Sequence, residues 1–204
     1  MKCADLIFLF KICFIRIRDL FYTMIRLLFH ICCGPCATTV IEQLKVDYHI
    51  TGYFYNPNIH PEEEYDRRLD AVRTVAECFG IPLIEGVYEP QKFFDAVRGH
   101  EHEPENGMRC SICYHLRLSD TAHTAMKTSY DAIATTLTVG PMKKAHIINS
   151  IGKKEAEREG IEFVAGDWKK KDGFKHSCEL TRALGIYRQH YCGCLFSMRK
   201  DERL

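Results

Sequence analysis

From Met24 onward, short apolar runs alternate with longer stretches in which apolar residues recur at helical spacing. An apolar run of about four to eight residues is typical of a buried strand, and recurrence every three to four residues is typical of a helix. Their alternation favours an α/β fold with a mainly parallel sheet flanked by helices. The predicted strands are residues 25–31, 50–55, 82–87, 132–137 and 161–165.

The clearest predicted helix covers residues 61–79. Pro61 suits a first turn, and Gly80 is typical of the position just after a helix. The residues expected to face the core are Tyr65, Leu69, Val72, Ala76 and Phe79. Further helices are predicted over residues 36–45, 90–97, 113–127, 143–159 and 177–188.

The first 23 residues differ from the rest, because basic residues and Asp19 interrupt their apolar runs. None of these runs approaches the roughly 18 residues needed to span a bilayer. We expect residues 1–23 to be an N-terminal extension upstream of a true start at Met24. Residues 24–204 are expected to form one α/β domain that is cytoplasmic and does not associate with a membrane.

Composition limits the possible partners and draws attention to cysteine. The net charge of +1 is not that of a strongly basic nucleic-acid-binding protein, so local basic patches would have to provide any binding to nucleic acid. Disulfides are rare in a reducing cytoplasm, which makes metal ligation the leading interpretation of clustered thiols. Seven of the eleven cysteines form three groups, namely Cys32, Cys33 and Cys36, then Cys110 and Cys113, then Cys192 and Cys194.

The number of clustered thiols favours two centres. One tetrahedral ion or one cubane cluster takes four thiolates, and seven are present. Cys32 and Cys33 are neighbours whose side chains diverge in extended chain, so we expect them to serve different centres. A centre with three protein ligands keeps a position open for substrate.

Three other interpretations stay open at this point. In the first, a four-cysteine zinc site has a purely structural role and stabilises the fold of a tRNA- or protein-binding module. Cys33 and Cys36 match the Cys-Gly-Pro-Cys motif of a thioredoxin-like dithiol oxidoreductase. An ATP-using tRNA-modifying enzyme is the third, although no glycine-rich phosphate loop follows the first strand.

Position within the predicted sheet supports a site at the cysteines. Residues 32–36 directly follow the first strand, residues 55–58 follow the second, and residues 135–137 end the fourth. Ligands of open parallel sheets bind beyond the carboxyl ends of the strands. The helix after the first strand directs its N-terminus at the thiols, which lowers thiol pKa values and favours metal binding.

Together these motifs resemble the QueH family of cobalamin-independent epoxyqueuosine reductases, over nearly the whole chain from Met24 to Met198. The resemblance is carried by residues 30–36 (HICCGPC), 55–61 (YNPNIHP), 64–65 (EY), 109–114 (RCSICY), 117–118 (RL), 135–137 (TTL), 143 (K) and 187–194 (YRQHYCGC). Any one motif is weak, but their order and spacing are specific.

The resemblance implies a 4Fe-4S cluster beside a mononuclear iron, on a catalytic domain that resembles the nucleotide alpha-hydrolase (HUP-like) fold. Carried onto this sequence, it implies Cys33, Cys110, Cys113 and Cys192 as cluster ligands. It implies Cys32, Cys36 and Cys194 as ligands of the iron. Members of the family can carry a carboxylate at the position of Cys36, so an all-sulfur iron would differ in its potential and Lewis acidity.

The implied reaction is the two-electron reduction of epoxyqueuosine to queuosine at the wobble position of tRNA, with electrons from an external donor. Tyr114, His115 and Tyr191 adjoin or closely follow ligand cysteines and are the candidate proton donors. The candidate contacts to substrate and tRNA are Tyr55, Asn56, Asn58, Arg109, Arg117 and Lys143. Tyr55 or Trp168 is expected to stack on the splayed wobble base.

Overall fold

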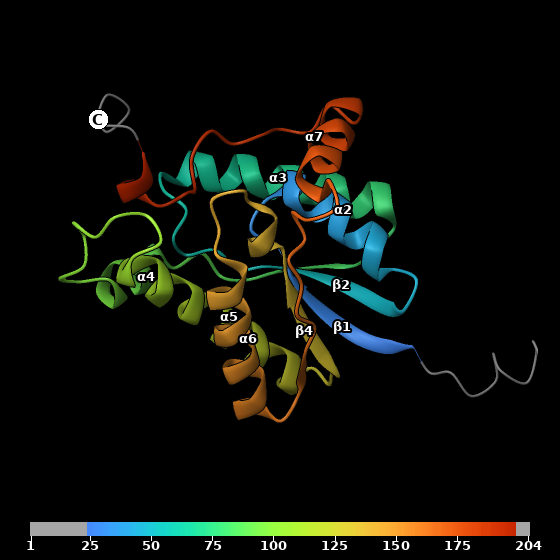
Figure 1. The fold of residues 1–204 in the computed structure, drawn as a ribbon, viewed down its shortest axis with the longest axis horizontal. Coiled ribbons are helices and arrows are strands. Elements are labelled where there is room, and N and C mark those ends of the chain that lie inside the picture. The colour runs from blue at the N-terminus through green and yellow to red at the C-terminus, as the bar shows by residue number, and fades with distance from the viewer. Residues whose placement is uncertain (1–23, 199–204) are drawn as a thin grey trace, which may run out of the picture.

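The structure of the protein is a computed structural model that describes residues 24–198 (Figure 1). Its centre is a sheet of five parallel strands in the order β3-β2-β1-β4-β5. All five strands were predicted by the apolar runs, with shifted ends. The strands are β1 (Ile25–His30), β2 (Tyr48–Phe54), β3 (Leu83–Glu85), β4 (Ala132–Thr135) and β5 (Glu162–Phe163).

Helices cover both faces of this sheet (Figure 1). On one face lie α2 (Gly34–Leu44), α3 (Glu62–Phe79) and α7 (Gly173–Ala183), and on the other lie α5 (Met108–Lys127) and α6 (Ala145–Glu159). The short α4 (Pro90–Ala96) packs against α5. This is the predicted α/β fold with a parallel sheet flanked by helices.

The central strand β1 supplies side chains to both layers of the core. Leu27 and Phe29 pack under α2 and α3, whereas Leu28 packs with residues of α5 and β4. Both faces of β1 are buried because crossover helices cover both sides of a parallel sheet. The continuous apolar run at the start of the domain follows from this position.

Helix α3 confirms the residues that were predicted to face the core. Tyr65, Leu69 and Val72 belong to the core cluster under α2, and the helix ends at Gly80 with a left-handed φ of 64°. Glu62, Glu63 and Glu64 occupy the first turn, where negative charge complements the helix dipole.

Helix α5 begins five residues before the position that its apolar spacing predicts. Gly107 is extended, and the helix starts at Met108 rather than at Cys113. Cys110 and Cys113 therefore lie three residues apart on one helix, a spacing that places both thiols on the same face. Helix α7 also lies earlier than predicted and ends at Ala183, before Gly185 with φ of 64°.

The strand order reverses between β1 and β4. Crevices at such reversal points, outside the carboxyl ends of the strands, are the usual ligand sites of doubly wound sheets. Cys32 to Cys36 follow β1 here, and the 3-10 helix η1 (Thr136–Val139) follows β4.

Within residues 24–198 no helix combines the length and apolar character that a membrane crossing requires. The expectation that residues 1–23 form an extension lies outside the described residues.

Candidate metal centre and substrate pocket

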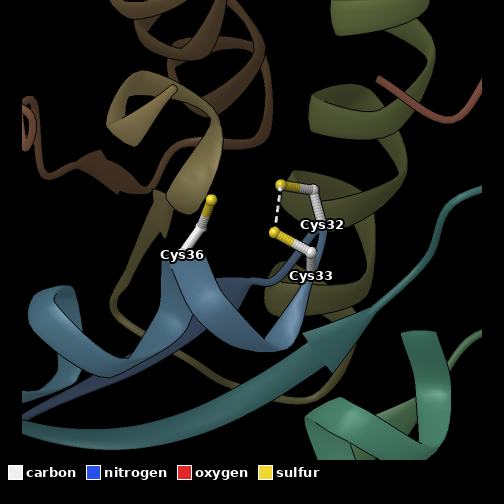
Figure 2. Close-up of side chains that lie close together, drawn as sticks. All are labelled: Cys32, Cys33 and Cys36. Carbon is white, nitrogen blue, oxygen red and sulfur yellow. Dashed lines mark hydrogen bonds between the residues drawn. The ribbon is translucent and has the colours of Figure 1, made fainter. Parts of the chain in front are cut away.

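The first thiol group lies where β1 passes into α2. The Sγ atoms of Cys32, Cys33 and Cys36 all lie within 4.8 Å of one another, and a hydrogen bond of 3.8 Å joins the first two (Figure 2). The expected divergence of Cys32 and Cys33 was wrong, because the chain bends at Cys32 before α2 begins. Three sulfurs this close together suit the ligand shell of a single ion.

The three thiols share their protons unequally. Hydrogen bonds from Cys33 and Cys36 lower the pKa of Cys32 well below its usual value, and Thr136 and Arg117 act in the same direction. The same contacts with Cys32, together with burial, raise the pKa values of Cys33 and Cys36. The group thus favours the thiolate at Cys32 over those at Cys33 and Cys36, and a bound metal would displace the remaining protons.

Polar side chains from the neighbouring strand ends fix this turn. The Thr136 hydroxyl accepts a hydrogen bond from the Cys32 backbone N–H at 2.9 Å and lies 3.2 Å from the Cys32 sulfur. The buried His30 ring contacts Thr135 and the carbonyl of Tyr55. Burial and the charge of Arg117 lower the pKa of His30 to about 4, so the imidazole is neutral at neutral pH.

The second thiol group forms a separate cavity under α5. Cys110, Cys113, Cys192 and Cys194 line it together. The pKa of Cys113 is raised to about 12, chiefly by burial; Arg117 opposes this increase, and the three other thiols of the cavity add to it. Four thiols that converge from two places in the chain, helix α5 and the C-terminal turn, match the ligand number of a cubane cluster.

Arg68 holds the turn that carries Cys192 and Cys194. Its guanidinium donates to the backbone carbonyls of Cys192 at 3.1 Å and Tyr191 at 3.0 Å, and it pairs with Glu64 at 2.7 Å. Both members of this pair are at most 2% exposed. The turn also binds through the His60 N–H, which donates to the carbonyl of Gly193 at 2.8 Å.

The sequence interpretation missed Arg68 as a site residue. A signal was available, because Glu64 and Arg68 stand four residues apart beside the buried stripe of α3. A charged pair at that spacing on a core-facing helix indicates a buried ion pair.

The surroundings of the four-thiol cavity fit an electron-rich group. Four residues that line it carry buried polar atoms without a hydrogen-bond partner among residues 24–198. These atoms are Asn58 Oδ1, Arg109 Nε, Tyr114 OH and Arg117 Nη2. Leaving a buried donor unpaired costs about 1–3 kcal/mol. Three of the four are donors, and sulfur atoms of a cluster and its thiolates would accept their hydrogen bonds.

An open pocket of about 340 Å³ adjoins both thiol groups. Its walls include Cys32 and Cys36 from the first group and Cys192 from the second. Arg117 and Lys143 line this pocket and the four-thiol cavity alike. A ligand in the open pocket therefore reaches both sets of sulfurs.

The three predicted proton donors lie in three different places. Tyr191 lines the open pocket, where its hydroxyl donates to the His60 carbonyl. Tyr114 faces the four-thiol cavity, and burial raises its pKa. His115 lies in a separate hollow, paired with Glu155 at 2.8 Å, so the structure does not bring it to the cysteines.

The predicted substrate and tRNA contacts are mostly internal. Asn56 binds the Ile31 carbonyl and Arg117, Asn58 faces the four-thiol cavity, and Arg109 binds the carbonyls of Glu101 and Glu103. Only Arg117 and Lys143 of this set reach the open pocket.

The two aromatic residues expected to stack on the base do not line the open pocket. Tyr55 stacks on Tyr53 and lines the hollow of His115. Trp168 packs against the core and donates from its indole N–H to the Thr135 carbonyl. The aromatic side chains that line the pocket are Phe174 and Tyr191.

The chain is similar to known proteins over most of its length. The model of the family described as epoxyqueuosine reductase QueH matches residues 27–200. The QueH of Streptococcus pyogenes is 36% identical over 179 residues, which cover 85% of this chain and 70% of the relative. The QueH of Thermotoga maritima is 36% identical over 174 residues, covering 84% of this chain and 89% of the relative.

Solved structures with little sequence similarity share the fold. The U34-tRNA thiolase NcsA of Methanococcus maripaludis, solved with its [4Fe-4S] cluster, superposes with a TM-score of 0.56 at 14% identity, covering 89% of this chain and 64% of the thiolase. A predicted tRNA methyltransferase subunit of Methanocaldococcus jannaschii gives a TM-score of 0.51 at 10% identity, covering 81% of this chain and 93% of the subunit.

Proposed function

This chain belongs to the QueH family of epoxyqueuosine reductases, and we propose that it reduces epoxyqueuosine to queuosine at the wobble position of tRNA by means of two iron centres held by its seven clustered cysteines. The reduction removes the epoxide oxygen: two electrons and two protons enter, both C–O bonds break, an alkene forms and water leaves. The electrons come from an external donor that the chain does not identify.

The observation that carries this proposal is the open pocket with thiols of both groups in its wall. A redox reaction on a bulky nucleoside needs a binding space in contact with electron-carrying groups. Neither a structural zinc site nor a simple dithiol explains why six thiols and several unpaired donors line two adjoining spaces. When bound, the cluster would supply electrons one at a time and the iron an open Lewis-acid position.

We assign the two cofactors to the two thiol groups. The resemblance and the geometry agree on Cys110, Cys113 and Cys192 for the cluster and on Cys32 and Cys36 for the iron. They differ at Cys33 and Cys194. Cys33 lies within 4.8 Å of Cys32 and Cys36, and Cys194 lines the four-thiol cavity. The geometry therefore favours Cys194 as the fourth cluster ligand and Cys33 as the third ligand of the iron.

The residues of this chain that hold the substrate are those around the open pocket. We assign the wobble base to the space beside Phe174 and Tyr191, since aromatic faces stack on splayed bases. Arg188 is exposed at this pocket and packs over Phe174 at 5.3 Å, where its charge can meet a phosphate or the base. Of the three predicted proton donors, only Tyr191 is retained in the substrate pocket.

Anaerobic turnover on tRNA tests the function. The reconstituted protein is incubated with a strong reductant and epoxyqueuosine-containing tRNA, and the nucleosides are identified by mass. We expect queuosine with the wild-type protein and none with Cys110→Ser, which removes one proposed cluster ligand. Cys78→Ser is the matched control, because Cys78 is an exposed cysteine of α3 outside both thiol groups. Iron-loaded wild-type protein that forms no queuosine would overturn the proposal.

A further inference from the structure

Arg117 is a buried cation at the boundary between the open pocket and the four-thiol cavity. Its side chain is 2% exposed and lines both spaces. Its Nε donates to the Cys113 carbonyl at 3.3 Å and its Nη1 to Asn56 Oδ1 at 3.4 Å. Its Nη2 is buried and has no hydrogen-bond partner among residues 24–198.

Lys143 is a second cation at the same boundary. Its Nζ lies 3.0 Å from the Cys192 sulfur and 3.0 Å from Glu105 Oε1, and the side chain is 12% exposed. Within residues 24–198, Lys143 forms an ion pair with Glu105. Glu105 does not line the four-thiol cavity.

The charge balance at the cavity is uneven. Arg109, Arg117 and Lys143 contribute three positive groups to its wall, and no Asp or Glu of the described residues lines it. The Nη1 atom of Arg109 already donates hydrogen bonds to two backbone carbonyls, those of Glu101 and Glu103. The other two cations are held where an anionic group bound to the four thiols would lie against them.

We propose that Arg117 and Lys143 are positioning residues that raise the reduction potential of the iron–sulfur cluster, an inference that rests on the proposed function. Four thiolates give a bound cluster net negative charge, and reduction makes it more negative. Cations buried beside it therefore stabilise the reduced form more than the oxidised form. Hydrogen bonds to the cluster sulfurs act in the same direction.

The location of the two cations also bears on their predicted role as substrate and tRNA contacts. Arg117 and Lys143 line the open pocket, but little of either side chain is exposed to bulk solvent, where most phosphates of a bound tRNA would lie. Loss of either charge is thus expected to alter electron transfer more than tRNA affinity.

An anaerobic redox titration of the holoprotein, followed by electron paramagnetic resonance of the reduced cluster, measures this effect without turnover. We expect Arg117→Gln and Lys143→Gln to shift the midpoint potential to more negative values. Arg117→Lys and Lys143→Arg keep the charge and are expected to shift it less. Arg188→Gln is the matched control, since it removes an exposed charge from the open pocket and is expected to leave the potential unchanged.

The outcomes separate the two proposals. Wild-type protein that binds no cluster overturns the proposed cofactor before any variant is measured. Variants that hold a full cluster and titrate at the wild-type potential overturn the role of these cations alone. Where Arg117→Gln fails to hold a cluster, Lys143→Gln decides; if neither holds one, both residues are structural and the inference is wrong.

Discussion

At the scale of single residues, Gly193 constrains the backbone of the turn that carries Cys192 and Cys194. Its φ of 122° is a conformation that L side chains rarely adopt, and a Cβ there would lie 2.9 Å from Arg68 Nη1. We expect Gly193→Ala to cost about 1–3 kcal/mol of strain and to lower the iron bound per chain, because it displaces the turn between two proposed ligands. Urea unfolding and iron analysis measure both effects. Gly80→Ala is the control, because its φ is also positive but nothing lies near its Cβ. Full iron binding by Gly193→Ala would contradict this role.

Glu64 is the buried anion behind the same turn. Burial alone would raise the pKa of this carboxyl, but hydrogen bonds from Tyr187 and Arg68 outweigh burial and hold the pKa below its usual value. Because the folded-state pKa is the lower one, the ion pair stabilises the protein above the unfolded pKa of about 4.3 and loses this effect as pH falls through the folded value. Breaking a buried pair on one side costs about 3–5 kcal/mol.

We therefore expect Glu64→Gln to unfold at lower urea concentration at pH 7, with the difference from wild type narrowing as the pH falls below about 4. Glu85→Gln is the control, because Glu85 pairs with Arg73 at the surface with its side chain 40% exposed. Such a pair contributes at most about 1 kcal/mol. Equal effects of the two substitutions would argue against a buried ion pair at Glu64.

At the scale of elements, the ends of β1 and β4 are joined through Thr136. Its hydroxyl accepts the Cys32 N–H, which would otherwise lack a partner at the start of the thiol turn. We expect Thr136→Val to cost about 1–3 kcal/mol in unfolding free energy, since valine keeps the shape but leaves the donor unpaired. Thr136→Ser keeps the hydroxyl and is expected to stay close to wild type. A valine variant as stable as the serine variant would show that this hydrogen bond contributes little.

Apolar spacing predicts which elements form, but not where polar segments join them. The strands and the core-facing residues of α3 could be predicted because buried positions carry apolar side chains, and this pattern is visible in the sequence. The start of α5 was predicted too late because the first turns carry Arg109, Cys110 and Ser111, which look like a polar loop when read alone. Their place in a helix becomes evident only from the cavity that Cys110 and Cys113 share.

At the scale of the whole molecule, the sequence predicts the set of seven thiols and the crevice that holds them. It does not predict their grouping, because that depends on how the C-terminal turn folds back on α3 through Arg68. The same long-range packing encloses Arg117 and Lys143, which sequence alone suggested as tRNA contacts. Contacts between distant segments decide both points, since Arg68 and Cys192 are 124 residues apart, Arg117 and Asn56 are 61 apart, and Lys143 and Cys192 are 49 apart.

The Mössbauer spectrum of protein reconstituted with ⁵⁷Fe tests the central claim that the two thiol groups hold two iron centres. We predict two subspectra in a ratio of about 4:1, for a cubane cluster and a single iron. Cys194 lines the four-thiol cavity, so Cys194→Ser should diminish the larger component. Cys33 lies with Cys32 and Cys36, so Cys33→Ser should diminish the smaller one. A single component, or a colourless protein that retains zinc, would contradict the account.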